Sequence, residues 1–263
     1  MDQAELLREM VRKETGLLKG ENRNAIEIYA LVSGRKGIVK TDFLMDLAAA
    51  LKKKGRKPLL MLPRPSVAKP SCRQELPPWL FNGSLRSVSD TDVIDIDYEG
   101  IKILLFDYCL SEAFADKFLK LNDVDIILAD AGGEINLNTL SLISFSQKVI
   151  LITPPGPSDL ADAYRLVKVM EQCNLSKDVR VVIDRCPDFP SGMDAYDRLH
   201  STSGAFLNKP LKNLGCIING ALADKQADEK EINEIAEAVM KEQSSSRIYS
   251  MEQVYERLKK VYL

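Results

Sequence analysis

The stretch from Ile26 to Thr41 reads I-E-I-Y-A-L-V-S-G-R-K-G-I-V-K-T and joins three local patterns. Residues 26–32 alternate as a strand does, and residues 33–37 form a glycine-containing turn. Lys40 and Thr41 then begin a segment, continuing to Lys54, whose apolar residues recur at helical spacings of three and four. In such an arrangement, backbone amides and the helix N-terminus bind phosphate, lysine neutralises it and threonine holds magnesium.

Strand-like and helix-like segments alternate over the rest of the chain. The predicted strands are 59–62, 93–98, 101–106, 124–128, 148–153, 179–183 and 214–218, of which 93–98 and 101–106 form a hairpin. The predicted helices are 112–121, one after residue 136, 158–172, 193–207, 229–241 and 251–262, and residues 63–81 are irregular and rich in proline. This alternation predicts an α/β fold, a mostly parallel twisted sheet with helices on both faces.

Composition excludes several classes of protein. With 45% hydrophobic and 28% charged residues, the 263-residue chain is too apolar for a disordered protein. Its net charge of −2 predicts no general attraction to nucleic acid. One histidine and five scattered cysteines without C-x-x-C spacing argue against a metal site and predict reduced thiols. There is no signal peptide and no apolar run that would cross a bilayer, so we expect a cytoplasmic protein.

The loop from Ser33 to Thr41 resembles the deviant Walker A loop of the MinD/ParA ATPases, S-G-K-G-G-V-G-K-T. This resemblance implies a P-loop NTPase fold of the MinD type, within the SIMIBI class, over residues 21–243. The phosphate loop would comprise Gly34, Arg35, Lys36, Gly37, Ile38, Val39, Lys40 and Thr41. Arg35 replaces the signature lysine of the family, and Val39 replaces a glycine where the chain bends around the β-phosphate. A β-branched residue is stiff and occupies phosphate space there, so we expect a degenerate loop.

Other positions of the resemblance also depart from the family. Leu62 and Arg64 stand where the family has two aspartates, one of which positions the attacking water. Asp130 and Gly132 match the family's switch segment, whereas Asp184 replaces the asparagine that recognises adenine. An aspartate accepts hydrogen bonds but cannot donate them. We therefore expect a pseudo-ATPase that is not itself an enzyme and needs no cofactor, with ATP and magnesium as ligands if the site still binds.

The chain begins with D-Q-A-x-x-L-R over Asp2 to Arg8, in a segment 1–20 whose apolar residues suit a short amphipathic helix. Periodicity alone favours packing of this helix on its own domain. The motif, however, resembles the activator segment of FlhG-type flagellar number regulators, which docks on the signal-recognition-particle-type GTPase FlhF and stimulates hydrolysis. By that resemblance Gln3 lies near the partner's GTP, Asp2, Leu7 and Arg8 make docking contacts, and Ala4 completes the motif.

The segment 244–263 ends in a second amphipathic stripe. Its apolar positions are Met251, Val254, Tyr255, Leu258, Val261 and Tyr262. The family often ends in a membrane-targeting helix, and tyrosines with basic residues suit a membrane interface. Docking on the protein's own surface is an equal alternative for this helix.

The resemblance as a whole predicts an FlhG-like regulator of flagellum placement and number. It would act as a scaffold and as an activator of FlhF, with basal-body or C-ring components as further partners. We expect it in the cytoplasm, with peripheral contact at the inner face of the cell membrane through the last helix, and we expect no nucleic-acid partner. The alternative is an active MinD/ParA-type ATPase that dimerises on ATP and binds membrane or DNA.

Overall fold

The computed structural model describes residues 26–34, 40–63, 94–98, 101–106, 118, 123–175, 177–218, 225–241 and 253–257. The predicted helix 112–121 and the irregular segment 63–81 lie outside this part of the chain, apart from Phe118 and Pro63. The same holds for the N-terminal segment 1–20.

One sheet of eight strands forms the centre of the molecule, in the order β3-β4-β2-β5-β1-β6-β7-β8. Its strands are β1 (Glu27–Val32), β2 (Pro58–Pro63), β3 (Ile94–Tyr98), β4 (Ile101–Phe106), β5 (Ile126–Asp130), β6 (Lys148–Thr153), β7 (Asp178–Cys186) and β8 (Lys212–Ile218). All neighbouring pairs are parallel except β3 and β4, which are antiparallel. The mostly parallel sheet and the 93–106 hairpin are therefore confirmed.

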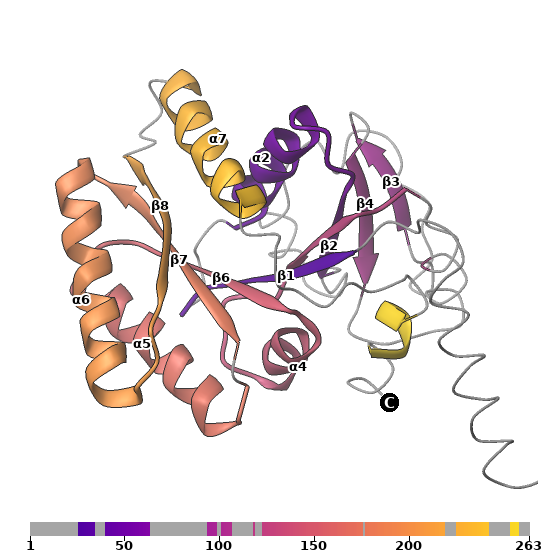
Figure 1. Cartoon of the computed structure of the whole chain (residues 1–263). Coiled ribbons are helices and arrows are strands. Elements are labelled where there is room, and N and C mark those ends of the chain that lie inside the picture. Colours follow the sequence, from indigo (N-terminus) through magenta and orange to yellow (C-terminus); the bar gives the residue numbers. More distant parts are fainter. Residues whose placement is uncertain are drawn as a thin grey trace, which may run out of the picture.

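Helices cover both faces of this sheet, as Figure 1 shows. The helices α2 (Lys40–Lys53) and α7 (Lys225–Lys241) pack on one face, where they bury the second hydrophobic cluster of the protein. The helices α4 (Leu137–Phe145), α5 (Pro157–Gln172) and α6 (Phe189–Leu207) cover the other face. The three-layer α/β architecture predicted from the alternation is thus present.

The central strand β1 is buried on both faces. Ile28, Ala30 and Val32 point to the layer of α4 and α5, and Tyr29 and Leu31 point to the layer of α2 and α7. A strand covered by helices on both sides is apolar at nearly every position, which explains the run Y-A-L-V.

Several element boundaries differ from the sequence prediction by two to four residues, and those of β7 and α6 have a clear structural cause. Strand β7 continues to Cys186, past the predicted end at 183, and its register against β8 shifts between Ile183 and Cys186. Helix α6 begins at Phe189 instead of 193, because the Asp188 side chain accepts a hydrogen bond from the Ser191 amide at 2.7 Å and caps the helix. The proline at 190 lies in the first turn, where its missing N–H costs nothing.

Candidate functional site

The predicted site residues gather at the carboxyl ends of the parallel strands. Gly34 follows β1, Asp130 ends β5 and Asp184 lies near the end of β7, and β6 lies between β1 and β7. These four strands are consecutive in the sheet, in the order β5-β1-β6-β7. In open α/β sheets this edge is where ligands bind. The predicted site residues therefore lie at one edge of the sheet, and their role as a binding site stays a prediction.

The segment that was predicted to form the phosphate loop connects β1 to α2. Gly34 ends the first described segment, and Lys40 and Thr41 begin the helix, with Asp42 in its first turn. The five residues between them, Arg35 to Val39, lie outside the described residues, so the predicted degeneracy of the loop stays a prediction.

Gly34 is held by close packing against α5. A β-carbon at residue 34 would lie 2.4 Å from the carbonyl carbon of Asp162 and 2.5 Å from the amide nitrogen of Ala163. Both are backbone atoms of a helix, which cannot rotate out of the way. The first glycine of the loop is thus required by the fold, whether or not phosphate binds.

The switch-like segment after β5 is ordered by its own hydrogen bonds. Asp130 Oδ1 accepts from the Gly132 amide at 2.8 Å, and Gly132 has a φ of 82°, which favours glycine. Thr139 Oγ1 donates to the carbonyl oxygens of Ala131 at 2.8 Å and Glu134 at 2.6 Å. The Asn136 side chain caps α4 by accepting from the Thr139 amide. These contacts give Asp130 and Gly132 a structural role in addition to the predicted one.

Leu62, which was predicted to replace an acidic residue, lies in the hydrophobic core. Its side chain is 1% exposed and belongs to the hydrophobic cluster beneath α2. It therefore cannot orient a water molecule, because it has no polar atom and faces the core. Arg64, its companion in the prediction, lies beyond the described end of β2.

Asp184 forms an ion pair with the next residue. Arg185 Nε donates to Asp184 Oδ2 at 3.1 Å, and the two side chains are 15% exposed for Asp184 and 51% for Arg185. Arg185 has a φ of 57°, an uncommon backbone conformation for a residue with a β-carbon. Such residues cluster at functional sites.

Comparison with known proteins finds two similar sequences, the antiactivator FleN and the flagellum site-determining protein YlxH. The chain is 22% identical over 214 residues to the antiactivator FleN of Pseudomonas aeruginosa, covering 73% of each chain. It is 28% identical over 123 residues to the flagellum site-determining protein YlxH of Helicobacter pylori, covering 46% of this chain and 41% of that protein. No protein-family profile matches.

Comparison with solved structures identifies the fold. The structure of the cell division protein MinD from Aquifex aeolicus has a TM-score of 0.56 at 17% identity, covering 85% of this chain and 99% of that one. The chain therefore has the fold of MinD. Its α/β fold is that of the P-loop NTPases, as the MinD-type loop predicted.

Of the two terminal segments, only residues 253–257 of the C-terminal one are described. Asp2, Gln3, Ala4, Leu7 and Arg8 lie outside the described residues. So do Met251, Leu258, Val261 and Tyr262 of the predicted membrane helix.

Residues 253–257 of that last helix are described, and Val254, Tyr255 and Arg257 contact the domain. Val254 is 0% exposed in the core, and the Tyr255 ring lies 6.4 Å from that of Phe118. Arg257 Nη2 donates to the Phe145 carbonyl at 3.1 Å. In this structure residues 253–257 therefore pack on the domain. No helix among the described residues meets the length and apolarity that a membrane span requires.

Lys177 strengthens the surface on which this helix packs. Its Nζ donates to the carbonyl oxygens of Ser144 at 2.8 Å and Ser146 at 2.6 Å, at the C-terminal end of α4. Burial, and then the charge of Arg257, lower the pKa of Lys177 to about 8. Two cations thus face the negative end of the α4 dipole, which is favourable for both.

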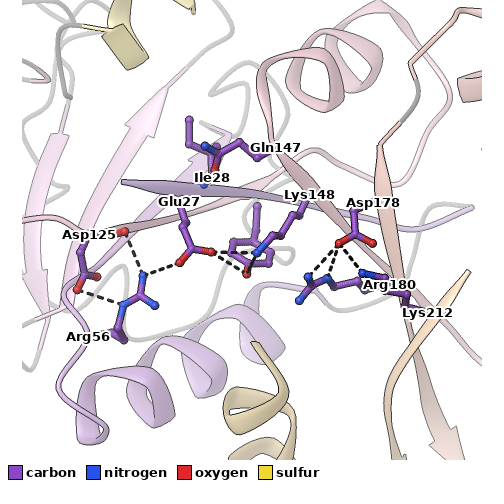
Figure 2. Close-up of polar contacts among 10 residues, drawn as sticks. Glu27, Ile28, Arg56, Asp125, Gln147, Lys148, Asp178, Arg180 and Lys212 are labelled. Atoms are coloured by element: carbon purple, nitrogen blue, oxygen red, sulfur yellow. Dashed lines mark hydrogen bonds and ion pairs between the residues drawn. The ribbon is translucent and has the colours of Figure 1, made fainter. Parts of the chain in front are cut away.

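A network of charges at the opposite, amino-terminal edge of the sheet was missed by sequence reasoning (Figure 2). Lys148 Nζ lies 3.1 Å from Glu27 Oε2, and Arg56 Nη2 lies 3.4 Å from Glu27 Oε1. Arg180, only 2% exposed, donates to Asp178 at 2.9 Å. The signal was present in the sequence, because four strands begin with a charged residue, namely Glu27, Lys148, Asp178 and Lys212.

The network changes the pKa values of Tyr29 and Asp178. Burial, and next the charge of Glu27, raise the pKa of the Tyr29 hydroxyl above its ordinary value. Burial alone would raise the pKa of Asp178, but the hydrogen bonds and charges of Arg180 and Lys212 outweigh it and lower that pKa. Since the network lies at the edge away from the phosphate loop, its role is to hold neighbouring strands together.

Two buried thiols were also missed as a pair. Cys186 of β7 and Cys216 of β8 both lie against Gly192 of α6, where a β-carbon would come within 2.9 Å and 3.2 Å of their sulfur atoms. Burial, and next the neighbouring Cys216, raise the pKa of Cys186 to about 12. Thiols so protonated are poor nucleophiles and poor metal ligands. Within the described ranges, no three His, Cys, Asp or Glu side chains group as a metal site would require.

Proposed function

We propose that this chain is an FlhG-like regulator of flagellum placement and number. The observation that carries the proposal is the similarity to FleN, which spans 73% of both chains and covers most of the MinD-type domain. YlxH, the second related sequence, is also named for a flagellar role. The two related proteins come from different bacteria, so the proposal has two separate relatives behind it.

The proposed action is stimulation of an FlhF-type GTPase by the N-terminal segment. The motif D-Q-A-x-x-L-R stands at Asp2 to Arg8, ahead of a MinD-type domain, as it does in FlhG-type proteins. A glutamine can donate and accept hydrogen bonds together and so orient the attacking water in a GTPase. In this proposal Gln3 has that role, and Asp2, Leu7 and Arg8 dock the segment on the partner.

The domain itself acts as a scaffold in this proposal, without ATP hydrolysis. Three features support the loss of hydrolysis. Leu62 is a buried apolar residue in place of an aspartate, Val39 replaces a loop glycine, and Asp184 replaces the adenine-binding asparagine. Flagellar basal-body or C-ring components are the proposed further partners, and the segment 244–263 is proposed to contact the inner face of the membrane.

The experiment is a GTPase assay with purified FlhF from the same organism and the full chain as activator. The parent protein should raise the rate of GTP hydrolysis, and Gln3→Ala should reduce that stimulation at least tenfold, on the scale of a water-orienting glutamine. Binding of Gln3→Ala to FlhF, measured separately, should remain, because Gln3 acts at the GTP and not as a docking contact.

Leu6→Ala is the matched control. Leu6 lies in the same segment, at a position that the motif leaves open, and alanine preserves helix propensity. This variant should stimulate like the parent. Equal stimulation by Gln3→Ala and the parent would remove the activator proposal. An equal loss in both variants would contradict the role given to Gln3 and indicate that the fold of the segment matters instead.

The alternative is an active MinD/ParA-type ATPase that dimerises on ATP and binds membrane or DNA. It is favoured by one specific observation, the retention of Gly34, Gly37, Lys40 and Thr41 in the phosphate loop. The basic stretch from residue 35 to 73 would supply its membrane or DNA contact. This reading requires magnesium-dependent ATP hydrolysis that Lys40→Ala abolishes.

A further inference from the structure

Cys186 and Cys216 reach the same face of the sheet through an irregular step in β7. Side chains alternate between the two faces along a strand, so regular pairing after Ile183 and Cys216 would turn Cys186 to the opposite face. The register shifts between Ile183 and Cys186, where β7 advances three residues and β8 advances two. The additional residue brings Cys186 opposite Ile218, and both thiols lie in the hydrophobic cluster beneath α6.

Arg185 is the residue at which the backbone of β7 makes this step. Its φ of 57° lies in the left-handed region, which is uncommon for a residue with a β-carbon. A bulge of this kind redirects the side chain that follows it, and here the next residue is Cys186. An unfavourable backbone conformation is therefore kept at the position that brings the two thiols together.

Gly192 of α6 leaves room for the two sulfur atoms. A β-carbon at residue 192 would lie 2.9 Å from Cys186 Sγ and 3.2 Å from Cys216 Sγ, so both sulfurs border the same small space. Burial is the main cause that raises the pKa of both thiols, and a hydrogen bond joins the two side chains. Both cysteines are free in the structure. Thiols that contact each other in this way can approach to the S–S bond length of about 2.05 Å with small changes of their side-chain torsions.

The two thiols differ in their access to solvent. Cys186 is 0% exposed, whereas Cys216 is 7% exposed. Their shared hydrogen bond also acts in opposite directions, because it favours the protonated form of Cys186 and the thiolate of Cys216. A small oxidant therefore reacts with Cys216 first, and Cys186 is the second thiol.

We propose that Cys186 and Cys216 are a redox modification site, which hydrogen peroxide converts to an intramolecular disulfide between β7 and β8. In the first step the Cys216 thiolate attacks one peroxide oxygen, the O–O bond breaks, and hydroxide leaves, so that Cys216 becomes a sulfenic acid. In the second step the Cys186 sulfur attacks the Cys216 sulfur, the S–O bond breaks, and the hydroxyl group leaves as water with the Cys186 proton. The first hydroxide takes up the proton that Cys216 had lost, so two thiols and one peroxide give one disulfide and two water molecules.

Burial makes the first step slow, and contact between the thiols makes the second step fast. Because burial raises the pKa of both cysteines, little thiolate is present at neutral pH, and the reduced pair is the resting state. Once Cys216 is oxidised, Cys186 already lies beside it, so the second step needs no encounter by diffusion. The disulfide would fasten β8, the last strand of the described sheet, to β7. The inference goes beyond the proposed function and does not rest on it.

The test is mass spectrometry of the full chain after treatment with hydrogen peroxide. The chain is first fully reduced and freed of reductant, then oxidised, its remaining thiols are blocked with iodoacetamide, and it is digested with trypsin without reductant. We expect the peptides 186–198 and 213–225 to be joined, with a mass two hydrogens below the sum of the two. This pair should be at least tenfold more abundant than any other linked pair of cysteines, and dithiothreitol should separate it.

Cys173→Ser is the matched control. Cys173 is an exposed cysteine that follows α5, so this variant should form the link between Cys186 and Cys216 as the parent does. The order of the two steps is tested in Cys186→Ser, where the sulfenic acid should persist on Cys216 and be trapped by dimedone. If that variant failed to fold, the linked peptides of the parent would still decide the proposal. The same oxidation in concentrated urea should give a mixture of linked pairs, because the selectivity comes from the fold.

Three outcomes overturn the inference. They are unlinked peptides 186–198 and 213–225 in a chain whose exposed Cys173 has been oxidised, linkage of either thiol mainly to another cysteine, and equal selectivity in urea. Dimedone that labels Cys186 in Cys216→Ser but not Cys216 in Cys186→Ser would contradict the order of the steps. None of these results affects the activator proposal, which is decided by FlhF stimulation and the Gln3→Ala variant.

Discussion

The backbone of α5 leaves no room for a β-carbon at residue 34. Since the atoms that a β-carbon would meet at 2.4 to 2.6 Å belong to the main chain of Asp162 and Ala163, α5 must move to accept any side chain. We predict that Gly34→Ala lowers the free energy of unfolding by about 1–3 kcal/mol, the usual cost of overpacking. Urea unfolding followed by circular dichroism measures this difference.

Gly204 supplies the matched control for this substitution. It lies inside α6, and a β-carbon there would meet nothing within 4 Å. Gly204→Ala should therefore raise the free energy of unfolding by about 0.5–1 kcal/mol, because alanine loses less backbone entropy in a helix. Equal effects of the two substitutions would contradict the steric role of Gly34.

Single residues of the site were predictable only where they follow from local pattern. Asp130 ends β5 and Asp184 lies two residues before the end of β7, in both cases after a run of apolar residues that marks the strand. The left-handed conformation of Arg185 and its ion pair were not predictable. A positive φ at an arginine depends on the shift of register between β7 and β8, which no local sequence signal encodes.

At the scale of elements, charged first residues link the strands at the amino-terminal edge. Lys148 of β6 and Glu27 of β1 are 6% and 12% exposed, and the Lys148 ammonium also lies 5.2 Å from the ring centroid of Tyr29. We predict that Lys148→Met lowers the free energy of unfolding by about 3 kcal/mol, because it leaves a buried carboxylate with one cation fewer. Chemical denaturation at pH 7 is the measurement.

The double variant Glu27→Gln, Lys148→Met tests the reason for that loss. Removing the carboxylate together with its cation should recover about 1 kcal/mol or more relative to Lys148→Met alone. Strictly additive losses would mean that Lys148 contributes by packing and not through Glu27. Both variants keep the side-chain volume nearly constant, so cavity formation contributes little to either value.

Element boundaries were harder to predict than element types. Every described strand and helix had been expected, yet α6 begins four residues earlier than the periodicity suggested. Pro190 interrupts the helical pattern in the sequence, and only the Asp188 cap shows that the helix has already begun. The last helix shows the same limit, since an apolar stripe fits a membrane and a protein surface equally well. The burial of Val254 came from tertiary packing alone.

At the scale of the whole molecule, alternating strands and helices with a glycine turn after the first strand were enough to predict the layers. The order of the strands was not predictable from these patterns. It places β1 between β5 and β6, so that loops distant in sequence meet at one edge. That order brings Gly34, Asp130 and Asp184 to the same side. The departures from the MinD-type sequence therefore affect one region of the molecule together.

This concentration of changes leads to a prediction about assembly. ATP can shift the equilibrium between monomer and dimer only if it binds the dimer more tightly than the monomer. Because the loop sequence is altered and Leu62 is buried, we expect ATP to favour the dimer little. We expect the sedimentation coefficient of the full chain to be the same with and without magnesium-ATP, and phosphate release to stay at the background rate.

Lys40→Ala should match the parent in both assays, whereas an intact MinD protein should dimerise and hydrolyse ATP under the same conditions. Magnesium-dependent turnover that disappears in Lys40→Ala would instead establish the active ATPase, and an ATP-induced rise in sedimentation coefficient would show that the dimer switch has survived the loss of the acidic residues.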